Sequence, residues 1–267
     1  MANQKIQLVA VDVDGTFVRS DYSFDRLRFE KILSRMKQAG CQFVVASGNQ
    51  YYQLRDLFPD YHETLSFVAE NGAYVKDRKE LVYTANISKK IVDAVIDMCR
   101  QYPEMKMVLC GVRRAYCQRG AVDQAFYDLA SIYYHRLAWV DDFKLVDDQI
   151  LKFALTVPQE KISDYHQLLA NQLADKVIPT TSGHDCIDLI VPGCHKASGL
   201  KRLVERWQIT PEQCLAFGDS ENDIEMLQYC GQSYAMANAS ERVKQAAKGI
   251  CPSNEDDGVL EILDQLF

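Results

Sequence analysis

Short, nearly continuous apolar runs mark the N-terminal part of the chain. Such runs, when rich in β-branched residues, are typical of strands buried on both faces of a parallel sheet. They predict strands over residues 6–12 (IQLVAVD), 41–46 (CQFVVA) and 66–70 (SFVAE). Asn71 and Gly72, which follow the third run, are a turn signal.

Between these runs the apolar residues follow helical spacing. The positions i, i+3, i+4 and i+7 are filled by Phe29, Ile32, Leu33 and Met36. This pattern predicts an amphipathic helix with Ser23 as its N-cap and Gly40 as its end. A second helix is predicted over residues 51–58, where Pro59 ends it.

The alternation of helices and strands returns near the C-terminus. Helices are predicted over residues 197–207, 223–229 and 258–267, and strands over residues 214–217 and 233–236. Residues 254–257 (NEDD) are expected to form a solvated loop. Buried strands that alternate with helices imply a Rossmann-like, three-layer α/β core, in which helices cover both faces of a parallel sheet.

The middle of the chain breaks this alternation. Predicted helices at 88–100 and 160–173 are interspersed with predicted strands at 105–110, 150–157 and 186–190. We interpret residues 85–189 as a second α/β domain inserted into the first. The predicted organisation is therefore a core made of residues 1–84 and 190–267, with the inserted domain between its two parts.

The charge of the chain limits its partners. The 267 residues include 30 Lys and Arg against 37 Asp and Glu, a formal net charge of −7 at pH 7. Because a nucleic-acid surface needs a basic footprint, this mild acidic excess argues against general nucleic-acid binding. It does not exclude a small anionic substrate, since one well-placed cation can outweigh the global sign.

The sequence predicts neither a membrane protein nor a secreted, disulfide-stabilised one. No run approaches the ~20 apolar residues that a bilayer-spanning helix requires, and the polar residues 1–5 do not resemble a signal peptide. Nine cysteines are scattered without a CxxC pair, several of them in apolar contexts such as Cys41, Cys110 and Cys214. We expect reduced, mostly buried thiols in a cytoplasmic protein.

The most specific signal is the pentapeptide DVDGT at residues 12–16, directly after the first predicted strand. Two carboxylates two residues apart point to the same side of an extended segment, and Gly15 then lets the backbone turn away sharply. Ligands of open parallel sheets bind at the carboxyl ends of the strands, so Asp12 and Asp14 are candidates for chemistry at that edge. The structural alternative, a turn residue or a helix cap, is typical of one isolated aspartate rather than of such a pair.

Three further groups of polar residues follow predicted strands or open a predicted helix. Ser47, Gly48 and Asn49 come after the strand CQFVVA, and the hexapeptide GDSEND at residues 218–223 comes after the strand CLAF. Lys196 opens the next predicted helix. Each alone has an ordinary interpretation as a turn residue, a helix cap or a surface lysine. Together with the aspartate pair they supply a nucleophile, an acid, a hydroxyl, a cation and metal ligands at neighbouring strand ends.

Four motifs carry a family resemblance that covers the whole chain. They read DVDGT, VVASGNQ, HKASGL and GDSENDIEM, and in this order they resemble those of the haloacid dehalogenase (HAD) superfamily of phosphotransferases. The long insert between the second and third motifs looks like the C2B-type cap of Cof-type phosphatases. The strings VVASGNQYYQL, FVAENGA and IDLIVPGCHKA are similar to those of bacterial sugar phosphatases in this group. Asn49 departs from the commoner pattern, in which an arginine supplies a further cation for the phosphate.

The resemblance implies a Mg²⁺-dependent phosphatase that hydrolyses small sugar phosphates, both hexose and pentose phosphates, through an aspartyl-phosphate. Asp12 would attack phosphorus, and Asp14 would protonate the leaving oxygen and then deprotonate water. The implied ligands of Mg²⁺ are the carboxylates of Asp12 and Asp219 and the backbone carbonyl of Asp14, with Asp223 orienting them. Partial burial and nearby like charge should raise the pKa of Asp14, as a general acid near neutral pH requires.

The same resemblance implies which residues meet the phosphate. Ser47, Gly48 and Asn49 would contact phosphate oxygens, and Asn222 would contact the phosphate or the nucleophile. Lys196 would neutralise the developing charge as a point cation.

For the inserted domain, the sequence narrows the substrate contacts only to a group of candidates. They are polar and aromatic side chains able to bind sugar hydroxyls: Tyr116, Tyr134, His135, Arg136, His184 and Asp188. Residues 17–21 are expected to form a mobile segment beneath the cap, which would exclude water when it closes. His195, next to Lys196, is assigned a structural role because the mechanism needs no base there.

Two other functions fit the same residues. A mutase or phosphotransferase would pass the phosphoryl group from Asp12 to another sugar, and the sequence does not decide between that acceptor and water. A non-catalytic sensor of phosphorylated ligands fits such a fold too, but here every chemical position is filled. The Asp12→Asn substitution separates an enzyme from a sensor, because an enzyme would lose turnover whereas a sensor would still work. The expected partner is a small phosphorylated sugar, with no nucleic acid and no membrane.

Overall fold

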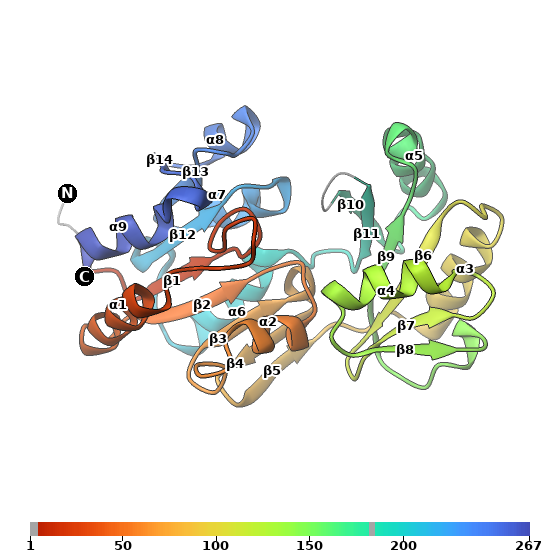
Figure 1. Cartoon of the computed structure of the whole chain (residues 1–267), viewed down its shortest axis with the longest axis horizontal. Coiled ribbons are helices and arrows are strands. Elements are labelled where there is room, and N and C mark those ends of the chain that lie inside the picture. The colour runs from red at the N-terminus through yellow and green to blue at the C-terminus, as the bar shows by residue number, and fades with distance from the viewer. Residues whose placement is uncertain (1–4, 182–184) are drawn as a thin grey trace.

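Two lobes, each built on its own β-sheet, make up the computed structural model, which describes residues 5–181 and 185–267 (Figure 1). Within these residues, the core lobe has eight strands in the order β14-β13-β12-β1-β2-β3-β4-β5. The core strands are β1 (Leu8–Val11), β2 (Gln42–Ala46), β3 (Ser66–Ala69), β4 (Tyr74–Asp77), β5 (Glu80–Thr84), β12 (Cys214–Gly218), β13 (Gln232–Met236) and β14 (Gly249–Cys251). The core helices are α1 (Arg26–Gln38), α2 (Tyr51–Leu57), α6 (Lys196–Arg206), α7 (Ile224–Tyr229), α8 (Glu241–Ala246) and α9 (Gly258–Leu266).

The core lobe has three layers because its central strands are apolar on both faces. On one face, Val9 and Val11 of β1 pack with residues of α1, α2 and α9. On the other face, Leu8 and Ala10 pack with residues of α6, α7 and α8. The predicted α/β core, with helices on both sides of its sheet, is therefore confirmed.

The core sheet is parallel from β14 to β3 and antiparallel from β3 to β5. The direction changes at the predicted turn, where Asn71 has a φ of 52° and Gly72 a φ of 85°. This turn reverses the chain within a few residues, whereas a parallel neighbour would need a long crossover connection. The sequence did not predict the two strands that follow, β4 and β5.

The cap lobe is a smaller α/β unit with a mainly antiparallel sheet. Its strands, among the described residues, follow the order β10-β11-β9-β6-β7-β8. They are β6 (Lys106–Gly111), β7 (Ala115–Gln118), β8 (Leu137–Val140), β9 (Ile150–Thr156), β10 (Ile178–Thr181) and β11 (Cys186–Ile190), and the helices are α3 (Lys89–Cys99), α4 (Gln124–Tyr133) and α5 (Ile162–Gln172). Helices α3 and α5 cover one face of this sheet, and α4 covers the other. The predicted domain boundaries at 84/85 and 189/190 stay a prediction, and they fall within one residue of the ends of β5 and β11.

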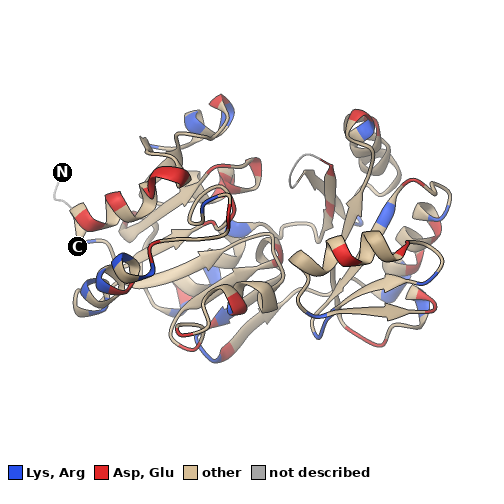
Figure 2. Ribbon diagram, in the orientation of Figure 1, with Lys and Arg blue, Asp and Glu red and all other residues tan. Residues whose placement is uncertain are grey.

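Charged residues lie mainly on helices and loops, and the central strands of the core sheet are uncharged over most of their length (Figure 2). Strands buried on both faces have this composition. Cys41, Cys110 and Cys214 are buried thiols, as predicted. Within residues 5–181 and 185–267, no helix combines the length and the apolar character needed to cross a bilayer.

The N-cap of the first helix lies two residues after the predicted one. Asp25 is the N-cap, and its carboxylate accepts a hydrogen bond from the N–H of Arg28 at 2.9 Å. Ser23, the predicted cap, instead closes a turn: its carbonyl accepts the N–H of Arg19, and its own N–H donates to Oδ1 of Asp21, both at 2.9 Å. Because Ser23 is engaged in this turn, the aspartate that follows it caps the helix.

The prediction of a solvated loop at residues 254–257 holds only for Glu255 and Asp256, which are exposed, whereas Asn254 is buried. Residues Asn254–Asp256 form a turn of 3-10 helix that holds the loop after β1. The contacts are a hydrogen bond from Nδ2 of Asn254 to the carbonyl of Val18 at 3.0 Å, one from the N–H of Ser20 to Glu255 at 2.8 Å, and an ion pair between Asp257 and Arg19. These polar residues therefore serve as partners for another loop.

The same contacts argue against the mobility predicted for residues 17–21. The ring of Phe17 is 4% exposed. Its centre lies 4.9, 5.1, 5.8 and 5.7 Å from the ring centres of Phe24, Phe29, Phe43 and Phe58. Aromatic packing of this kind adds to burial, so the loop that follows the two aspartates is anchored to the core.

Candidate active site

Asp12 and Asp14 lie just beyond the end of β1, at the carboxyl edge of the parallel strands. The N–H of Asp12 donates to the carbonyl of Phe217 at 3.1 Å, so the ladder with β12 continues to the first aspartate. Gly15 then has a φ of 72°, and a Cβ there would stand 2.5 Å from Oδ2 of Asp219. Glycine alone allows both this turn and this close approach, which bring the DVDGT loop against the loop after β12.

Lys196 is a buried cation between two carboxylates. Its Nζ donates to Oδ1 of Asp12 at 2.6 Å and to Oδ1 of Asp223 at 2.7 Å, and its side chain is 1% exposed. Burial lowers the pKa of Lys196, but the two carboxylates outweigh burial and hold the pKa above its ordinary value. The lysine therefore remains charged while buried.

His195 fixes the position of this lysine in the fold. It caps α6, and its Nδ1 accepts the N–H of Ser198 at 3.3 Å. The reciprocal bond runs from the N–H of His195 to Oγ of Ser198 at 3.0 Å. This capping box places Lys196 at the first position of the helix, and it gives His195 the structural role predicted from the sequence.

Asp219 and Asp223 belong to the turn after β12. Oδ2 of Asp223 accepts the N–H groups of Asp219 at 3.1 Å and of Ser220 at 3.0 Å, so this carboxylate shapes the loop. Oδ1 of Asp219 accepts the hydroxyl of Thr16 at 2.9 Å. Thr16 is the last residue of the DVDGT motif, and no separate role was predicted for it. Its hydroxyl ties the two acidic loops together.

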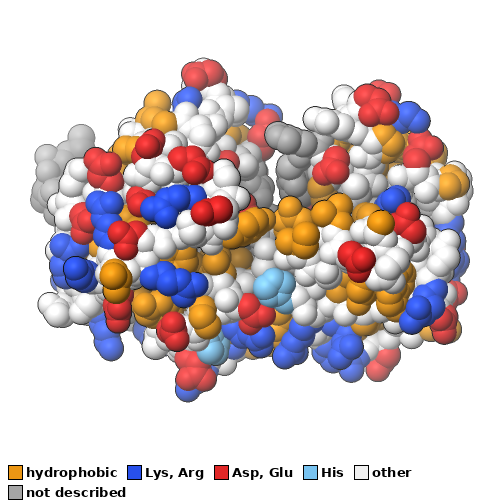
Figure 3. Space-filling view, viewed as in Figure 1, with side chains coloured by type: hydrophobic (Ala, Val, Ile, Leu, Met, Phe, Trp, Pro, Cys, Tyr) orange, Lys and Arg blue, Asp and Glu red, His pale blue; other side chains and the backbone are white. Residues whose placement is uncertain are grey.

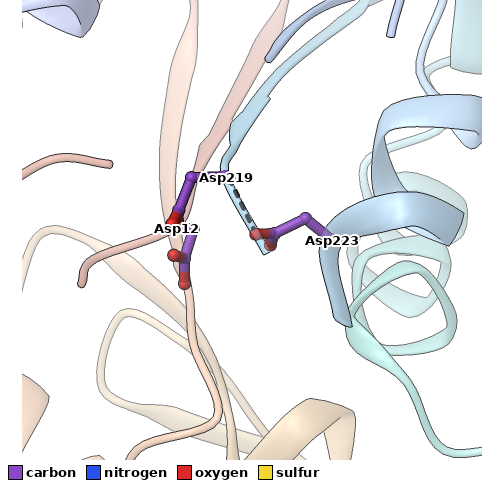
Figure 4. A group of neighbouring side chains, drawn as sticks. All are labelled: Asp12, Asp219 and Asp223. Carbon is purple, nitrogen blue, oxygen red and sulfur yellow. Dashed lines mark hydrogen bonds between the residues drawn. The ribbon is translucent and has the colours of Figure 1, made fainter. Parts of the chain in front are cut away.

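The carboxylates of Asp12, Asp219 and Asp223 gather in one place (Figure 4), and each offers an oxygen within 4.8 Å of the others. Burial is the largest cause that raises the pKa of Asp12 to about 7 and that of Asp223 to about 6. Burial and the nearby Asp223 also raise the pKa of Asp219. Three carboxylates face one ammonium, so the ionised cluster has an excess of negative charge.

This excess fits the predicted magnesium ion. Mg²⁺ prefers carboxylate and carbonyl oxygens, and a divalent cation would favour the ionised forms of the acids. Asp12 and Asp219 come from the two loops that meet here, whereas both oxygens of Asp223 already bind Lys196 and two backbone amides. The donor set therefore fits a divalent cation with Asp223 in an orienting role.

Asp14 lies against the second motif. Nδ2 of Asn49 donates to Oδ2 of Asp14 at 2.6 Å, and the N–H of Asn49 donates to Oγ of Ser47 at 3.0 Å. Burial raises the pKa of Asp14, and the hydrogen bond from Asn49 opposes this effect. The amide of Asn49 is neutral, so it holds Asp14 without the strong lowering of the pKa that an arginine would cause. Asn49 is therefore a suitable partner for an acid that donates a proton.

A cavity of about 240 Å³ lies beside Asn49, and both lobes contribute to its wall. Its lining is mainly apolar and includes Val13, Tyr22, Leu54, Leu57, Ile132 and His135. Tyr22, at a φ of 61°, interacts with Asp14 in the core and with Tyr133 of the cap. Hydrophobic side chains gather at the junction of the lobes on the face shown in Figure 3. An apolar space thus opens next to the predicted general acid.

Two of the cap candidates join the lobes. Nδ1 of His135 lies 2.8 Å from the carboxylate of Asp56, and the guanidinium of Arg136 lies 3.8 Å from the ring centre of Tyr52. His135 also lines the cavity, so its contact with substrate stays a prediction.

The other cap candidates have structural partners or are not described. The hydroxyl of Tyr116 donates to Asp148 at 2.9 Å, and Tyr134 packs with the residues beneath α4. Asp188 is 2% exposed and forms an ion pair inside the molecule. His184 lies outside the described residues.

A buried cluster not predicted from the sequence connects the cap sheet to the Ser47–Asn49 motif. Nζ of Lys152, on β9, donates to the carbonyl of Gly48 at 2.8 Å and to Oδ2 of Asp188 at 3.0 Å, and it lies 3.2 Å from Oε2 of Glu70. One signal could have revealed it. Lys152 interrupts the otherwise apolar strand ILKFALT, and lysine is almost never fully buried without a partner.

Asn71 extends the cluster toward the loop after β12. Its Nδ2 donates to Oδ2 of Asp188 at 3.0 Å, and its Oδ1 accepts Nδ2 of Asn222 at 3.1 Å. The sequence identified Asn71 only as a turn residue. The structure thus places the predicted site residues at one edge of the core sheet, while their individual roles stay predictions.

Comparison with known proteins gives a consistent family. A profile of haloacid dehalogenase-like hydrolases matches residues 9–263. An Escherichia coli K12 relative named 5-amino-6-(5-phospho-D-ribitylamino)uracil phosphatase YbjI is 40% identical over 262 residues, which cover 98% of this chain and 96% of the relative. A Cronobacter sakazakii relative named HMP-PP phosphatase is 25% identical over 234 residues, which cover 87% of this chain and 85% of the relative. A solved Streptococcus mutans structure is 35% identical with a TM-score of 0.93, over 98% of both chains.

These comparisons do not confirm the finer resemblance suggested by the motif strings. That resemblance was to the bacterial sugar phosphatase SupH (YbiV). The two phosphatases above are named instead for a ribitylaminouracil phosphate and for HMP-PP. What the names of these two relatives share is the removal of phosphate from a small compound.

Proposed function

The chain belongs to the haloacid dehalogenase-like hydrolases and is a phosphatase of that family, and from this premise we propose that it is a Mg²⁺-dependent phosphatase of small phosphorylated polyols that acts through an aspartyl-phosphate. The observation that carries the proposal is the buried contact between Asp12 and Lys196 beside Asp219 and Asp223. This arrangement provides a carboxylate nucleophile, a fixed cation and an oxygen-rich cation site within one group of side chains.

The reaction would proceed in two displacements at phosphorus. Lys196 holds Oδ1 of Asp12, so Oδ2 attacks phosphorus while the bond to the ester oxygen breaks and that oxygen takes the proton of Asp14. In the second step, water gives a proton to Asp14, and the oxygen of that water attacks phosphorus. The bond between phosphorus and Asp12 then breaks, which releases inorganic phosphate. The raised pKa of Asp14 supports its entry into the cycle as a protonated acid.

Three groups would stabilise the phosphate during both steps. When bound to the carboxylates of Asp12 and Asp219 and to the backbone carbonyl of Asp14, Mg²⁺ supplies the positive charge that the acidic cluster lacks. Lys196 contributes a second, fixed charge. Oγ of Ser47 already accepts the N–H of Asn49, so the hydroxyl hydrogen is available to a phosphate oxygen.

The cavity lined by Asn49 and Tyr22, which both contact Asp14, supports a leaving group larger than a bare sugar. Its apolar lining from Leu54, Leu57 and Ile132 suits the face of a flat ring, and His135 offers a polar partner at the rim. The E. coli relative is named for 5-amino-6-(5-phospho-D-ribitylamino)uracil, which joins a phosphorylated ribityl chain to such a ring. We propose this compound as the first substrate to test, with pentose and hexose phosphates as the simpler members of the class.

A phosphate-release assay with Mg²⁺ tests the proposal. The panel contains the ribitylaminouracil phosphate, ribose 5-phosphate, glucose 6-phosphate and HMP-PP. We expect release from the first three, loss of release in excess chelator, and no turnover by Asp12→Asn. Asp60→Asn, at an exposed site of the core, is the matched control and should keep full activity. Full activity of Asp12→Asn, or full activity in excess chelator, would contradict the mechanism.

The same panel separates the alternatives. Phosphate that appears on an added sugar rather than in solution would identify a phosphotransferase. Release from HMP-PP alone would leave the mechanism standing but overturn the proposed substrate class.

A further inference from the structure

We propose that Lys152, which the cap lobe contributes, is a positioning residue for the phosphate site of the core lobe. Its side chain is 3% exposed, and its Nζ contacts the carbonyl of Gly48, Asp188 and Glu70. An ammonium group remains in such a place only when its partners repay the loss of water. The inference rests on the proposed function, because it identifies what holds the groups that would bind the phosphate.

The first connection runs from Lys152 to the hydroxyl of Ser47 through a single peptide unit. The peptide between Gly48 and Asn49 is trans, so its carbonyl and its N–H point in opposite directions. The carbonyl accepts Nζ of Lys152 at 2.8 Å, and the N–H donates to Oγ of Ser47 at 3.0 Å. Ser47 is thereby left with its own hydrogen to donate to a phosphate oxygen.

The positive charge of Lys152, at the start of this series of hydrogen bonds, matters as well as the geometry of the bonds. A charged donor polarises the carbonyl that accepts it, and in a chain of hydrogen bonds each bond strengthens the next. Lys152 should therefore make the N–H of Asn49 a better donor and the hydroxyl of Ser47 a better donor in turn. A neutral side chain at position 152 would supply neither the fixed orientation nor this polarisation.

The second connection runs from Lys152 to Asn222. Oδ2 of Asp188 accepts both Nζ of Lys152 and Nδ2 of Asn71, each at 3.0 Å. Oδ1 of Asn71 then accepts Nδ2 of Asn222 at 3.1 Å. Asn71 has a φ of 52°, a conformation that non-glycine residues adopt rarely and keep only when their surroundings hold them. Two of the predicted phosphate contacts, Ser47 and Asn222, therefore depend on the same ammonium group.

The lysine and its main acceptor belong to different lobes. Lys152 lies on β9 of the cap sheet, whereas Gly48 and Asn71 belong to the core. The cap therefore does more than cover the site, because it supplies the group that orients the phosphate-binding side chains. This role would affect every substrate equally, whatever its leaving group.

Substitution of Lys152 by methionine tests the role, since methionine keeps an unbranched side chain but cannot donate. With Mg²⁺ present, calorimetry with inorganic phosphate should show binding weakened roughly 10- to 100-fold, the value of a charged hydrogen bond. We expect kcat/KM to fall by one common factor for the ribityl, pentose and hexose phosphates. Lys161→Met removes an exposed cap lysine that pairs with Glu104 at 2.7 Å, and this control should change neither quantity.

Two companion variants guard against loss of folding. Lys152→Met combined with Asp188→Asn removes the ammonium and one of its two carboxylate partners, and the asparagine keeps an oxygen that can accept Nδ2 of Asn71. The second partner, Glu70, has a pKa that burial raises, so it can take up a proton when the ammonium is gone. This double variant should bind phosphate as weakly as the single one. Asp188→Asn alone keeps the bond from Lys152 to Gly48 and should lose less, and Lys152→Arg, which keeps a charged donor, should recover part of the affinity.

Wild-type phosphate affinity in a folded double variant would overturn the inference. So would a loss of kcat/KM confined to one leaving group, which would identify Lys152 as a substrate contact. If the wild-type chain turned over no phosphate ester while Lys152→Met still weakened phosphate binding, the proposed function would fail and the positioning role would stand.

Discussion

Mg²⁺ should stabilise this protein far more at pH 8 than at pH 5, because the cation site needs the ionised forms of the acids that form and orient it. The folded-state pKa values of Asp12 and Asp223 are raised from 3.8 to about 7 and about 6. Without the cation, the stability that these acids contribute is fully present below pH 3.8 and is lost as the pH rises through 6 and 7. The cation needs Asp12 ionised as a ligand and Asp223 ionised to orient the site, so its effect grows over the same pH range.

The two pKa values set the size of the effect. At pH 5, a carboxyl group with a pKa of about 7 is ionised in roughly one molecule in 100, and one with a pKa of about 6 in roughly one in 10. Competition from both protons lowers the affinity for Mg²⁺ by about 1000-fold relative to pH 8. At saturating Mg²⁺, this factor corresponds to about 4 kcal/mol of stabilisation. In a protein of this size it corresponds to roughly 8 °C in Tm.

Thermal unfolding at several pH values between 5 and 8, in excess Mg²⁺ and in chelator, measures this difference. Asp223→Asn removes one of the competing protons and should flatten the pH dependence, whereas the exposed control Asp60→Asn should leave it unchanged. A Mg²⁺-induced shift in Tm that is equal at pH 5 and pH 8 would refute the reasoning, because the carboxylates would then not be the groups that protons and cation share.

Three further substitutions probe the acid, the cation site and the packing. Asp14→Asn removes the proton donor and should lower kcat by roughly 100- to 10,000-fold in the phosphate-release assay; an unchanged kcat would exclude Asp14 as the acid. Gly15→Ala brings a methyl group to 2.5 Å from Oδ2 of Asp219 and should weaken Mg²⁺ binding in calorimetry. Gly40→Ala, at a φ of 74° with no described atom within 4 Å of the added Cβ, should leave that binding intact, and equal losses would point to backbone strain alone. Phe17→Ala should lower the free energy of unfolding in urea by about 3–5 kcal/mol, and a loss below 1 kcal/mol would show that the ring contributes little to the core.

The parallel part of the core could be predicted because its strands are buried on both faces and therefore consist almost entirely of apolar residues. The four residues of β1 are all buried, and they read as an uninterrupted apolar run. Strand β5 gives no such signal, since none of its five residues is buried. Its place is set by pairing with β4 at the edge of the sheet, and the residues of β5 alone do not encode that pairing.

The same distinction separates the predicted and the missed site residues. Asp12, Asp14 and Thr16 lie within one short motif, so local spacing was enough to draw attention to that segment. Lys152 acts on a carbonyl 104 positions away in the sequence, at Gly48. A single sequence shows an isolated lysine in a strand but not the partner that explains it.

Strand β1, which leads to Asp12, pairs with β2 early in the sequence and with β12 far later in it. β1 pairs with β12, and the loop that follows β1 is held by residues 254–257. During synthesis, the segment bearing Asp12 therefore waits without these partners until the ribosome has released them. The cap lobe, a contiguous stretch whose sheet partners are all within it, can fold in the meantime. A chain released without residues 214–267 would thus present a folded cap beside an unassembled strand edge at Asp12.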